Sequence, residues 1–468
     1  MTNQKNKKSI NSTKKGNRNE IKKTAKKSSK RPARVIGVKD HCGNEGEYFS
    51  LLIDKLREFA NSYTLRNIDV PSIESFELYK KSKRVENDKE FYFVDGEKGE
   101  KLVLRPEITQ GIIRSILENN LLENNTGLER LFSLGKVYRK EKLQSGHYKE
   151  FTQADFEIIG DKKPMTEALF LAAVSLFFKD LGIDIQIQIN SLGDQLCRKE
   201  YSTRLVNFFK ERGKKTKMCN TCKNSLLKNP IALLDCQEED CVSLREEAPQ
   251  IVDILSQESR DHFTQVLEYL DEMGINYNLS PYLVRGFSYY NDTVYEFWPV
   301  NEKGEVLGKN SLAAGGRYDT YIHSFGGEET PAFGLAIGLE RTLSRVKDKS
   351  LLNFKKDDDI IFIAQLGDQA HMKCLQLYKE LKEEGFKVRQ CLSSDSLKVQ
   401  LEEAVRIQAK TSLILGKKEI MDGTVLLRDM DSGAQETVIF KKVKERLIKM
   451  NKITEKKVKI RKEAGIYG

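Results

Sequence analysis

Polar and apolar residues alternate in two runs between Leu131 and Gly160, on either side of a polar loop, Lys140–His147. A period of two residues is typical of β-strands with one buried face, so the pattern predicts a strand pair joined by this loop. In the second run, Gln153, Asp155 and Glu157 would share one face, opposite an apolar face of Ala154, Phe156 and Ile158. The polar face is either an exposed sheet surface or the floor of a ligand site. Arg139 would stand beside it.

Helical and strand patterns divide the rest of the chain into a long first part, an inserted segment and a shorter second part. Further strands and helices of the first part are expected at 48–63, 67–71, 90–93, 101–104, 109–116, 165–181 and 184–189. Residues 192–278 change to helical patterns with Lys- and Glu-rich faces, as in an inserted helical module. Strand patterns return at 283–297 and after a turn near Gly304. A charged segment at 347–359 marks the next boundary. The pattern from residue 360 onward predicts a small α/β domain with a mixed sheet, with bounds of 357–440. Residues 441–468 are predicted to contain a basic helix.

Composition and charge place the chain among globular proteins that carry a basic tail. A length of 468 residues predicts two or three domains, with 39% hydrophobic and 32% charged residues. No apolar run reaches the roughly 18 residues of a membrane span, and the N-terminus lacks the apolar core of a secretion signal. We therefore expect a cytoplasmic protein. Residues 1–34 hold ten Lys, three Arg and one Glu, a balance of +12, so the rest of the chain carries −2 and the net charge of +10 comes from this segment. It is predicted to be disordered, and it either attracts a polyanion such as nucleic acid or only increases solubility.

Four of the eight cysteines cluster within 23 residues. Because the chain lacks a secretion signal, a reducing environment is expected, and the cluster indicates a metal site rather than disulfides. The spacing x2, x13 and x4 is credible for a tetrahedral zinc ion bound by Cys219, Cys222, Cys236 and Cys241. The alternative is four free thiols.

The common nucleotide-binding motifs are missing from the sequence. Gly304–Asn310 imitates a P-loop but is one residue short and lacks the hydroxyl residue after the lysine. No GxGxxG follows a predicted strand. If the chain binds ATP, arginine side chains on an antiparallel sheet must hold it.

Several separated stretches together resemble class II histidyl-tRNA synthetases, from residue 35 to about residue 440. They are LRPEIT at 104–109, the strand pair with Arg139, LVRGFSYY at 283–290, AGGRYD at 314–319 and GLAIGLER at 334–341. The resemblance implies an α+β fold: a class II antiparallel sheet flanked by helices, a helical insertion and a C-terminal α/β anticodon-binding domain. The implied divisions are a tail at 1–34, a catalytic domain at 35–346 with its insertion at 192–278, an anticodon-binding domain at 357–440 and a basic C-terminal helix at 441–468.

The resemblance also implies an activity and a site. Histidine would react with ATP to give histidyl-adenylate, and histidine would then pass to the 3′ end of tRNA(His), with Mg²⁺ accompanying ATP. Because the attacking carboxylate is already ionised, the chemistry needs arginines that stabilise charge on phosphate rather than a general base. The implied catalytic residues are Arg139 and Arg285, and ATP would also contact Glu141, Gly338 and Arg341. The implied histidine-binding residues are Glu107, Thr109, Gln153, Glu157, Tyr289 and Tyr290. Gly315 and Gly316 would let the backbone approach the ligand.

Two departures from the family pattern leave alternatives open. His147 stands where the family commonly has Arg, and Ser288 stands where its RGxDYY stretch has Asp. The expected partners are tRNA(His), histidine and ATP in a homodimer, without a membrane. Lys398 and Gln400 are candidate anticodon contacts, or else residues of a solvated helix start. The alternatives are a histidine-sensing regulatory paralogue of ATP phosphoribosyltransferase and a tRNA-binding pseudo-synthetase.

Overall fold

The computed structural model describes residues 32–80, 91–124, 127–140, 146–211, 214–352, 360–390, 394 and 396–450. The predicted tail therefore lies almost wholly outside the described residues, and Glu141 and residues 451–468 of the predicted basic helix lie outside them too. Within the described part, no helix combines the length and apolar character needed to cross a membrane.

An eight-stranded sheet forms the first part of the chain, in the order β1-β5-β6-β11-β10-β9-β7-β8. Its six inner strands pair antiparallel, and each short edge strand pairs parallel. The strands are β1 (Arg66–Asn67), β5 (Glu129–Tyr138), β6 (Glu150–Ile159), β7 (Ile185–Ser191), β8 (Tyr277–Leu279), β9 (Asn291–Pro299), β10 (Ala313–Arg317) and β11 (Ala332–Gly338). This confirms the predicted antiparallel sheet and the strand pair on either side of the polar loop.

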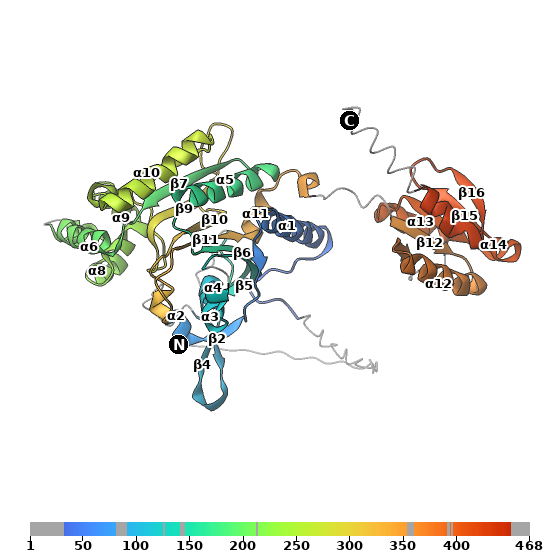
Figure 1. Cartoon of the computed structure of the whole chain (residues 1–468), viewed down its shortest axis with the longest axis horizontal. Coiled ribbons are helices and arrows are strands. Elements are labelled where there is room, and N and C mark those ends of the chain that lie inside the picture. The colour runs from blue at the N-terminus through green and yellow to red at the C-terminus, as the bar shows by residue number, and fades with distance from the viewer. Residues whose placement is uncertain are drawn as a thin grey trace, which may run out of the picture.

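Helices cover the two faces of this sheet unequally. The main apolar cluster joins Ala154, Phe156 and Ile158 of β6 to α1 (Gly43–Ser62), α5 (Pro164–Asp180), α10 (Gln257–Glu272) and α11 (Leu339–Arg345). Figure 1 shows α5 and α10 on one side of the sheet, and α3 (Thr109–Glu118) with α4 (Leu121–Asn124) on the other. The face toward α3 is the one that receives the polar side chains of β6.

A small sheet and a helical module flank the side toward α3. The order β2-β4-β3 joins β2 (Ile73–Ser75), β4 (Lys101–Leu104) and β3 (Phe93–Asp95), with α2 (Phe76–Lys80) following β2. The predicted helical insertion contains α6 (Gln195–Lys210), α7 (Lys214–Lys217), α8 (Asn220–Ser225), α9 (Glu239–Arg245) and α10. Apolar side chains of α6, α8 and α9 share one cluster with those of α3 and of the segment before β9. The insertion therefore packs against residues that are candidates for the site.

The second part is a five-stranded mixed sheet in the order β13-β12-β14-β15-β16. Its strands are β12 (Ile360–Gln365), β13 (Lys387–Gln390), β14 (Thr411–Leu415), β15 (Thr424–Asp429) and β16 (Gln435–Ile439), with helices α12 (Asp368–Glu383), α13 (Leu397–Arg406) and α14 (Lys417–Asp422). Residues 443–450 are helical, and Val443 and Leu447 are buried against this sheet. The α/β character predicted from the sequence is confirmed, and α14 is an additional helix.

Two sequence expectations for strands were wrong. Residues 283–290 form turns and bends rather than a strand, and β9 begins only at Asn291. The carbonyl of Leu283 accepts a hydrogen bond from the side chain of Asn190 rather than from the backbone of a neighbouring strand. After the turn at Gly304, Val306 makes a single isolated bridge with Val300.

Candidate active site

Polar residues of β6 form a buried floor, defined here as Gln153, Asp155 and Glu157. Asp155 is 1% exposed and Glu157 is 2% exposed. Glu157 is held at both oxygens: Thr109 donates to Oε1 at 2.7 Å, and Tyr318 donates to Oε2 at 2.5 Å. The alternative of an exposed sheet surface is therefore wrong, because these side chains are enclosed.

The carboxyl groups of the floor have strongly raised pKa values. Burial, followed by the charge of Glu107, raises the pKa of Asp155 to about 8. Burial also raises the pKa of Glu157 to about 8, although its bonds from Tyr318 and Thr109 act in the opposite direction. Asp155 Oδ2 and Gln153 Oε1 are buried without a hydrogen-bond partner among the described residues. Such a floor favours a ligand that brings positive charge or N–H donors.

A second carboxylate and two tyrosines stand opposite the floor. Tyr289 donates to Glu107 Oε2 at 3.0 Å, and the ring centroids of Tyr289 and Tyr290 are 4.6 Å apart. Burial raises the pKa of Tyr290 to about 12, Arg285 opposes the shift, and Glu107 and Glu157 add to it. The Arg285 guanidinium lies 5.9 Å from the Tyr290 ring centroid, so Tyr290 adjoins a charged group of the site.

Arg139 lies beside the floor, as the alternation predicted. Its Nε donates to the carbonyl of Pro106 at 2.8 Å, and its guanidinium lies 5.0 Å from the ring centroid of Phe151. The positive charge of Arg139 acts to lower the pKa of Asp155. The arginine is thus within electrostatic range of the acidic floor.

Arg285 approaches from the irregular segment before β9. Its Nη1 is paired with Glu296 Oε1, and Glu296 Oε2 accepts a 2.9 Å bond from Trp298 Nε1. Burial alone would lower the pKa of Arg285, but the charge of Glu296 gives a net rise. Arg285 therefore keeps its charge inside the protein. Its Nε is buried without a hydrogen-bond partner among the described residues.

Arg341 meets the end of the polar loop between β5 and β6. Its Nε donates to the carbonyl of Gly146 at 2.9 Å and its Nη1 to that of Ser311 at 3.3 Å. His147 Nε2 lies 3.0 Å from Asn310 Oδ1, so this loop end is attached to the same region. Arg341 lies in the first turn of α11, where a positive side chain opposes the helix dipole unless an anion is nearby.

Glycines make room for this arrangement. Gly334 pairs with Glu157 across β6 and β11, and a Cβ at Gly334 would overlap the Glu157 carboxylate. A Cβ at Gly315 would collide with the backbone of Gly334, and one at Gly316 would lie 2.9 Å from Tyr290 Cδ1. Sequence reasoning expected Gly315 and Gly316 to meet the ligand; the space they leave is filled by strand backbone and by Tyr290. Gly338 precedes α11 as its N-cap.

Three participants were not assigned roles from the sequence: Tyr318, Asp155 and Glu296. Tyr318 stands within the AGGRYD stretch, and Asp155 within the alternating run, so both lay inside recognised patterns. Their importance appears only from burial and from which atoms they approach. Glu296 ends the family-like stretch LVRGxxYYNxTVxE that begins at Leu283, so it too lay inside a recognised pattern.

The four cysteines of the insertion converge. The sulfur atoms of Cys219, Cys222, Cys236 and Cys241 all lie within 4.8 Å of one another. The Cys219 side chain also accepts from the backbone N–H of Cys222 at the start of α8. Four thiol groups at such separations suit tetrahedral zinc with Zn–S bonds of about 2.3 Å.

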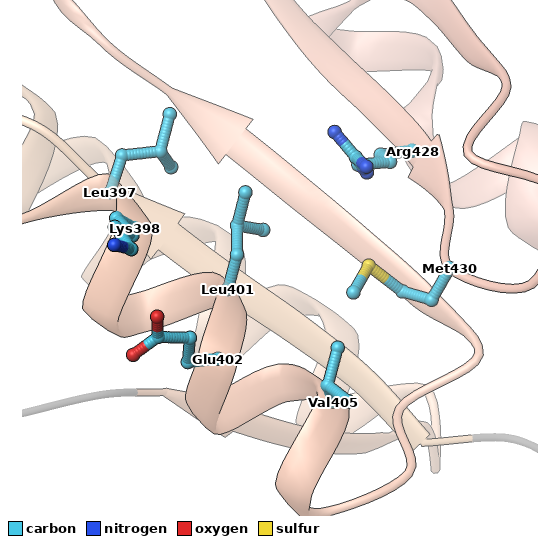
Figure 2. Close-up of a pocket in the computed structure, with 7 residues that line it drawn as sticks. All are labelled: Leu397, Lys398, Leu401, Glu402, Val405, Arg428 and Met430. Atoms are coloured by element: carbon cyan, nitrogen blue, oxygen red, sulfur yellow. The ribbon is translucent and has the colours of Figure 1, made fainter.

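Sequence reasoning was wrong about Gln400 in the second part. Its side chain is fully buried, accepting from the backbone N–H of Gln365 at 2.9 Å and donating to its carbonyl at 2.7 Å. It connects α13 to β12 and is closed to RNA. Lys398 instead borders a groove of about 580 Å³ between α13 and the end of β15. Figure 2 shows its lining residues: Leu397, Lys398, Leu401, Glu402, Val405, Arg428 and Met430.

Comparisons with known proteins agree with the arrangement of both parts. A family model described as histidyl-tRNA synthetase matches residues 37–342, and one described as an anticodon binding domain matches residues 360–450. The chain is 34% identical over 407 residues to a histidine–tRNA ligase of Caldicellulosiruptor saccharolyticus, covering 86% of this chain and 95% of the relative. A histidine–tRNA ligase of Acetivibrio thermocellus is 33% identical, with coverages of 86% and 96%. The crystal structure of apo Staphylococcus aureus histidyl-tRNA synthetase superposes with a TM-score of 0.72 at 27% identity, covering 89% of this chain and all of that chain.

Proposed function

The chain belongs to the histidyl-tRNA synthetase family and acts as a histidine–tRNA ligase, and from this premise we propose which of its residues perform each part of the reaction. The observation that supports the assignment best is the buried acidic floor of β6 with charged arginines beside it. Histidine supplies the floor with an N–H donor from its imidazole ring and with the positive charge of its α-ammonium group. An ATP phosphate supplies the arginines with negative charge.

Glu157 is proposed to read the imidazole ring. A neutral imidazole has one N–H donor and one nitrogen acceptor. Glu157, fixed by Thr109 and Tyr318, accepts the N–H, and the Tyr290 phenol donates to the second nitrogen. Glu107, Thr109 and Gln153 surround the α-ammonium, with Tyr289 orienting Glu107. Residue types that satisfy both ring nitrogens discriminate against side chains lacking either one.

The arginines are proposed to bring two anions together. Arg139 holds the α-phosphate of ATP, and Arg285 holds the junction between that phosphate and the histidine carboxylate. A carboxylate oxygen attacks the α-phosphorus, the bond from phosphorus to the bridging oxygen breaks, and pyrophosphate leaves with the bond electrons. No proton moves in this step. Preorganised guanidinium groups stabilise the charge that develops on the α-phosphate oxygens.

The rest of the ATP molecule lies toward α11 in this proposal. Arg341 would contact the outer phosphates, and Gly338, at the N-terminus of the helix, and Glu141 are proposed as further ATP contacts. Mg²⁺ binds ATP through phosphate oxygens and neutralises part of their charge. After adenylate formation, a hydroxyl of the terminal tRNA ribose attacks the histidyl carbonyl, the bond from that carbonyl to the phosphate oxygen breaks, and AMP leaves while its phosphate accepts the hydroxyl proton.

Further assignments follow the same premise. We divide the chain into a tail at 1–34, a catalytic domain at 35–346 with its insertion at 192–278, an anticodon-binding domain at 357–440 and a basic helix at 441–468. The enzyme acts as a homodimer in the cytoplasm, where ATP and tRNA are available. A zinc ion bound by Cys219, Cys222, Cys236 and Cys241 joins the short segments of the insertion that carry these cysteines and stabilises them.

Histidine-dependent exchange of pyrophosphate into ATP, run beside charging of tRNA(His), tests this proposal. Exchange and charging with histidine alone among the amino acids support it. Exchange without charging would point to a histidine sensor, and the absence of both reactions would point to a tRNA-binding pseudo-synthetase.

A further inference from the structure

The segment that carries Arg285, Tyr289 and Tyr290 has no regular secondary structure of its own. We call residues 282–290 the arginine loop. It is irregular, with a bend at 286–287 and a turn at 288–289, and β9 begins immediately after it. Because no strand partner fixes the loop, side chains from elsewhere must define the positions of the three residues it presents.

Both ends of the arginine loop are attached to other elements. At its start, Tyr282 donates to the carbonyls of Glu246 and Ala248 at 3.1 and 3.0 Å, both in the insertion after α9. Asn190 of β7 donates to the carbonyl of Leu283 at 3.0 Å. At its end, Arg198 of α6 donates to two carbonyls, that of Ser288 at 3.1 Å and that of Tyr290 at 2.7 Å.

The two bonds of Arg198 come from one nitrogen, Nη1. Its two hydrogens reach the carbonyls of Ser288 and Tyr290, so the peptide group before Tyr289 and the one after Tyr290 both face this nitrogen. This arrangement is compatible with the tyrosine pair: the Tyr289 hydroxyl reaches Glu107, while the Arg285 guanidinium lies 5.9 Å from the Tyr290 ring centroid. Arg198 thereby connects the insertion to the residues assigned to histidine.

The environment of Arg198 is unusual for a residue that only supports the fold. No ion pair joins it to an acid within the described ranges, and its Nε is buried there without a hydrogen-bond partner. Burial lowers its pKa, and no neighbouring charge offsets that shift. A partly buried guanidinium that is balanced only by carbonyl dipoles is unfavourable for stability, so its presence is better explained by what it orients.

We propose that Arg198 is a positioning residue for histidine activation, acting from the helical insertion to hold Tyr290 and Arg285 in place. This inference rests on the proposed function of the arginine loop. It makes α6 part of the adenylate-forming machinery, in addition to any contact that the insertion makes with tRNA.

The test compares three variants of the full-length protein in histidine-dependent pyrophosphate exchange. R198M keeps an unbranched, flexible side chain but removes all donors. R198K restores an ammonium group that can serve both carbonyls. R204M makes the same replacement as R198M on the same helix, at an exposed arginine paired with Glu200. Rates are normalised to the burst of adenylate formation, so that misfolded molecules do not count.

We expect R198M to lower kcat/KM for histidine by about 30-fold, because displacements near 1 Å at a reacting centre have effects of this order. R198K should remain within about fivefold of the wild type, R204M should be unchanged, and the KM for ATP should move by less than about threefold in each. If R198M does not fold, R198A is measured under the same criteria.

Three results would overturn the inference while leaving the proposed function intact. They are wild-type exchange kinetics in R198M, equal losses in R198M and R198K, or a lower thermal midpoint of R198M with unchanged activity per active site. Absence of exchange in the wild type would instead refute the proposed function.

Discussion

Gly334 lies directly opposite Glu157 in the register of β6 and β11, and the missing side chain of the glycine is the space that the carboxylate occupies. A Cβ at position 334 would overlap Glu157 Oε2 and press on the backbone of Phe156. The floor therefore requires a glycine at position 334 as well as the carboxylate of Glu157.

G334A should displace the Glu157 carboxylate and lower histidine-dependent exchange by on the order of 100-fold, because a small misplacement at the reacting centre has effects of this size. Steady-state exchange at varied histidine concentration measures this loss. ATP binding, followed by calorimetry, should be retained, since Glu157 faces the imidazole. Full exchange activity in G334A would show that Glu157 is not the imidazole-reading group.

Because Arg285 is paired with Glu296, substitutions of these two residues should have non-additive effects on the rate of adenylate formation. R285A should raise the barrier to adenylate formation by several kcal/mol, about the size of an oxyanion-type loss. E296Q should have a smaller effect, since it removes only the group that holds the arginine. The double variant should be no worse than R285A, because both changes act through one guanidinium. Single-turnover adenylate formation measures all three, and an effect of R285A below about tenfold would contradict its assigned role.

Two raised carboxyl pKa values predict how stability depends on pH. The pKa of Asp155 rises from 3.8 in the unfolded chain to about 8 in the folded protein, and that of Glu157 also rises to about 8. Between about pH 4 and 8 the folded, ligand-free protein therefore holds protons that the unfolded chain has released. Stability from these groups is present at low pH and is lost as the pH rises toward 8.

D155N removes one of these titrations. The slope of unfolding free energy against pH should become shallower by up to about 1.4 kcal/mol per pH unit in that range, and the variant should gain stability relative to the wild type at pH 8. Scanning calorimetry from pH 5 to 8 without histidine provides the measurement. D95N, at an exposed position of β3, serves as the control. Parallel curves for D155N and the wild type would refute the assigned proton.

The cysteine cluster predicts one equivalent of zinc per chain. C236S should lower the zinc content of purified protein and decrease the thermal midpoint, because three ligands hold the insertion less firmly than four. C42S, at an exposed cysteine outside the cluster, should change neither quantity. Elemental analysis that finds less than about 0.2 equivalents in the wild type would exclude a structural metal.

His147 predicts a gain-of-function substitution. Its ring lies 3.0 Å from Asn310, next to the bond between Gly146 and Arg341. H147R would place a planar, permanently charged donor at this end of the loop, which suits a phosphate better than imidazole does. We expect the KM for ATP to fall by about threefold or more, with the KM for histidine unchanged. A higher KM for ATP would mean that the bond to Asn310 matters more than the added charge.

Strong local patterns were sufficient to predict much of this molecule. The alternation in β6 identified both faces of the strand, because a side-chain period of two leaves little choice once one face is apolar. The spacing of the cysteines anticipated their convergence. The order of the stretches around Arg139, Arg285 and Arg341 anticipated the family.

Other features depend on tertiary contacts that leave no local trace. The arginine loop contains apolar and aromatic residues that resemble a strand, yet its carbonyls are bound by Asn190 and Arg198 from distant elements. Gln400 is a polar residue near the start of a helix, a position that is usually exposed. Its side-chain oxygen and nitrogen instead both form hydrogen bonds with the backbone of Gln365. The raised pKa of Asp155 follows from the burial of its side chain, and the hydrogen bond from Tyr318 to Glu157 follows from their distance. Neither can be inferred from the local sequence.

The attachment of the arginine loop to α6 constrains how this enzyme can be rebuilt. A helical module borrowed from a relative must bring a donor that reaches the carbonyls of residues 288 and 290, or the chimera would charge tRNA poorly even with an unaltered sheet. Grafting residues 192–290 as one block preserves that dependency, whereas exchanging the insertion alone breaks it.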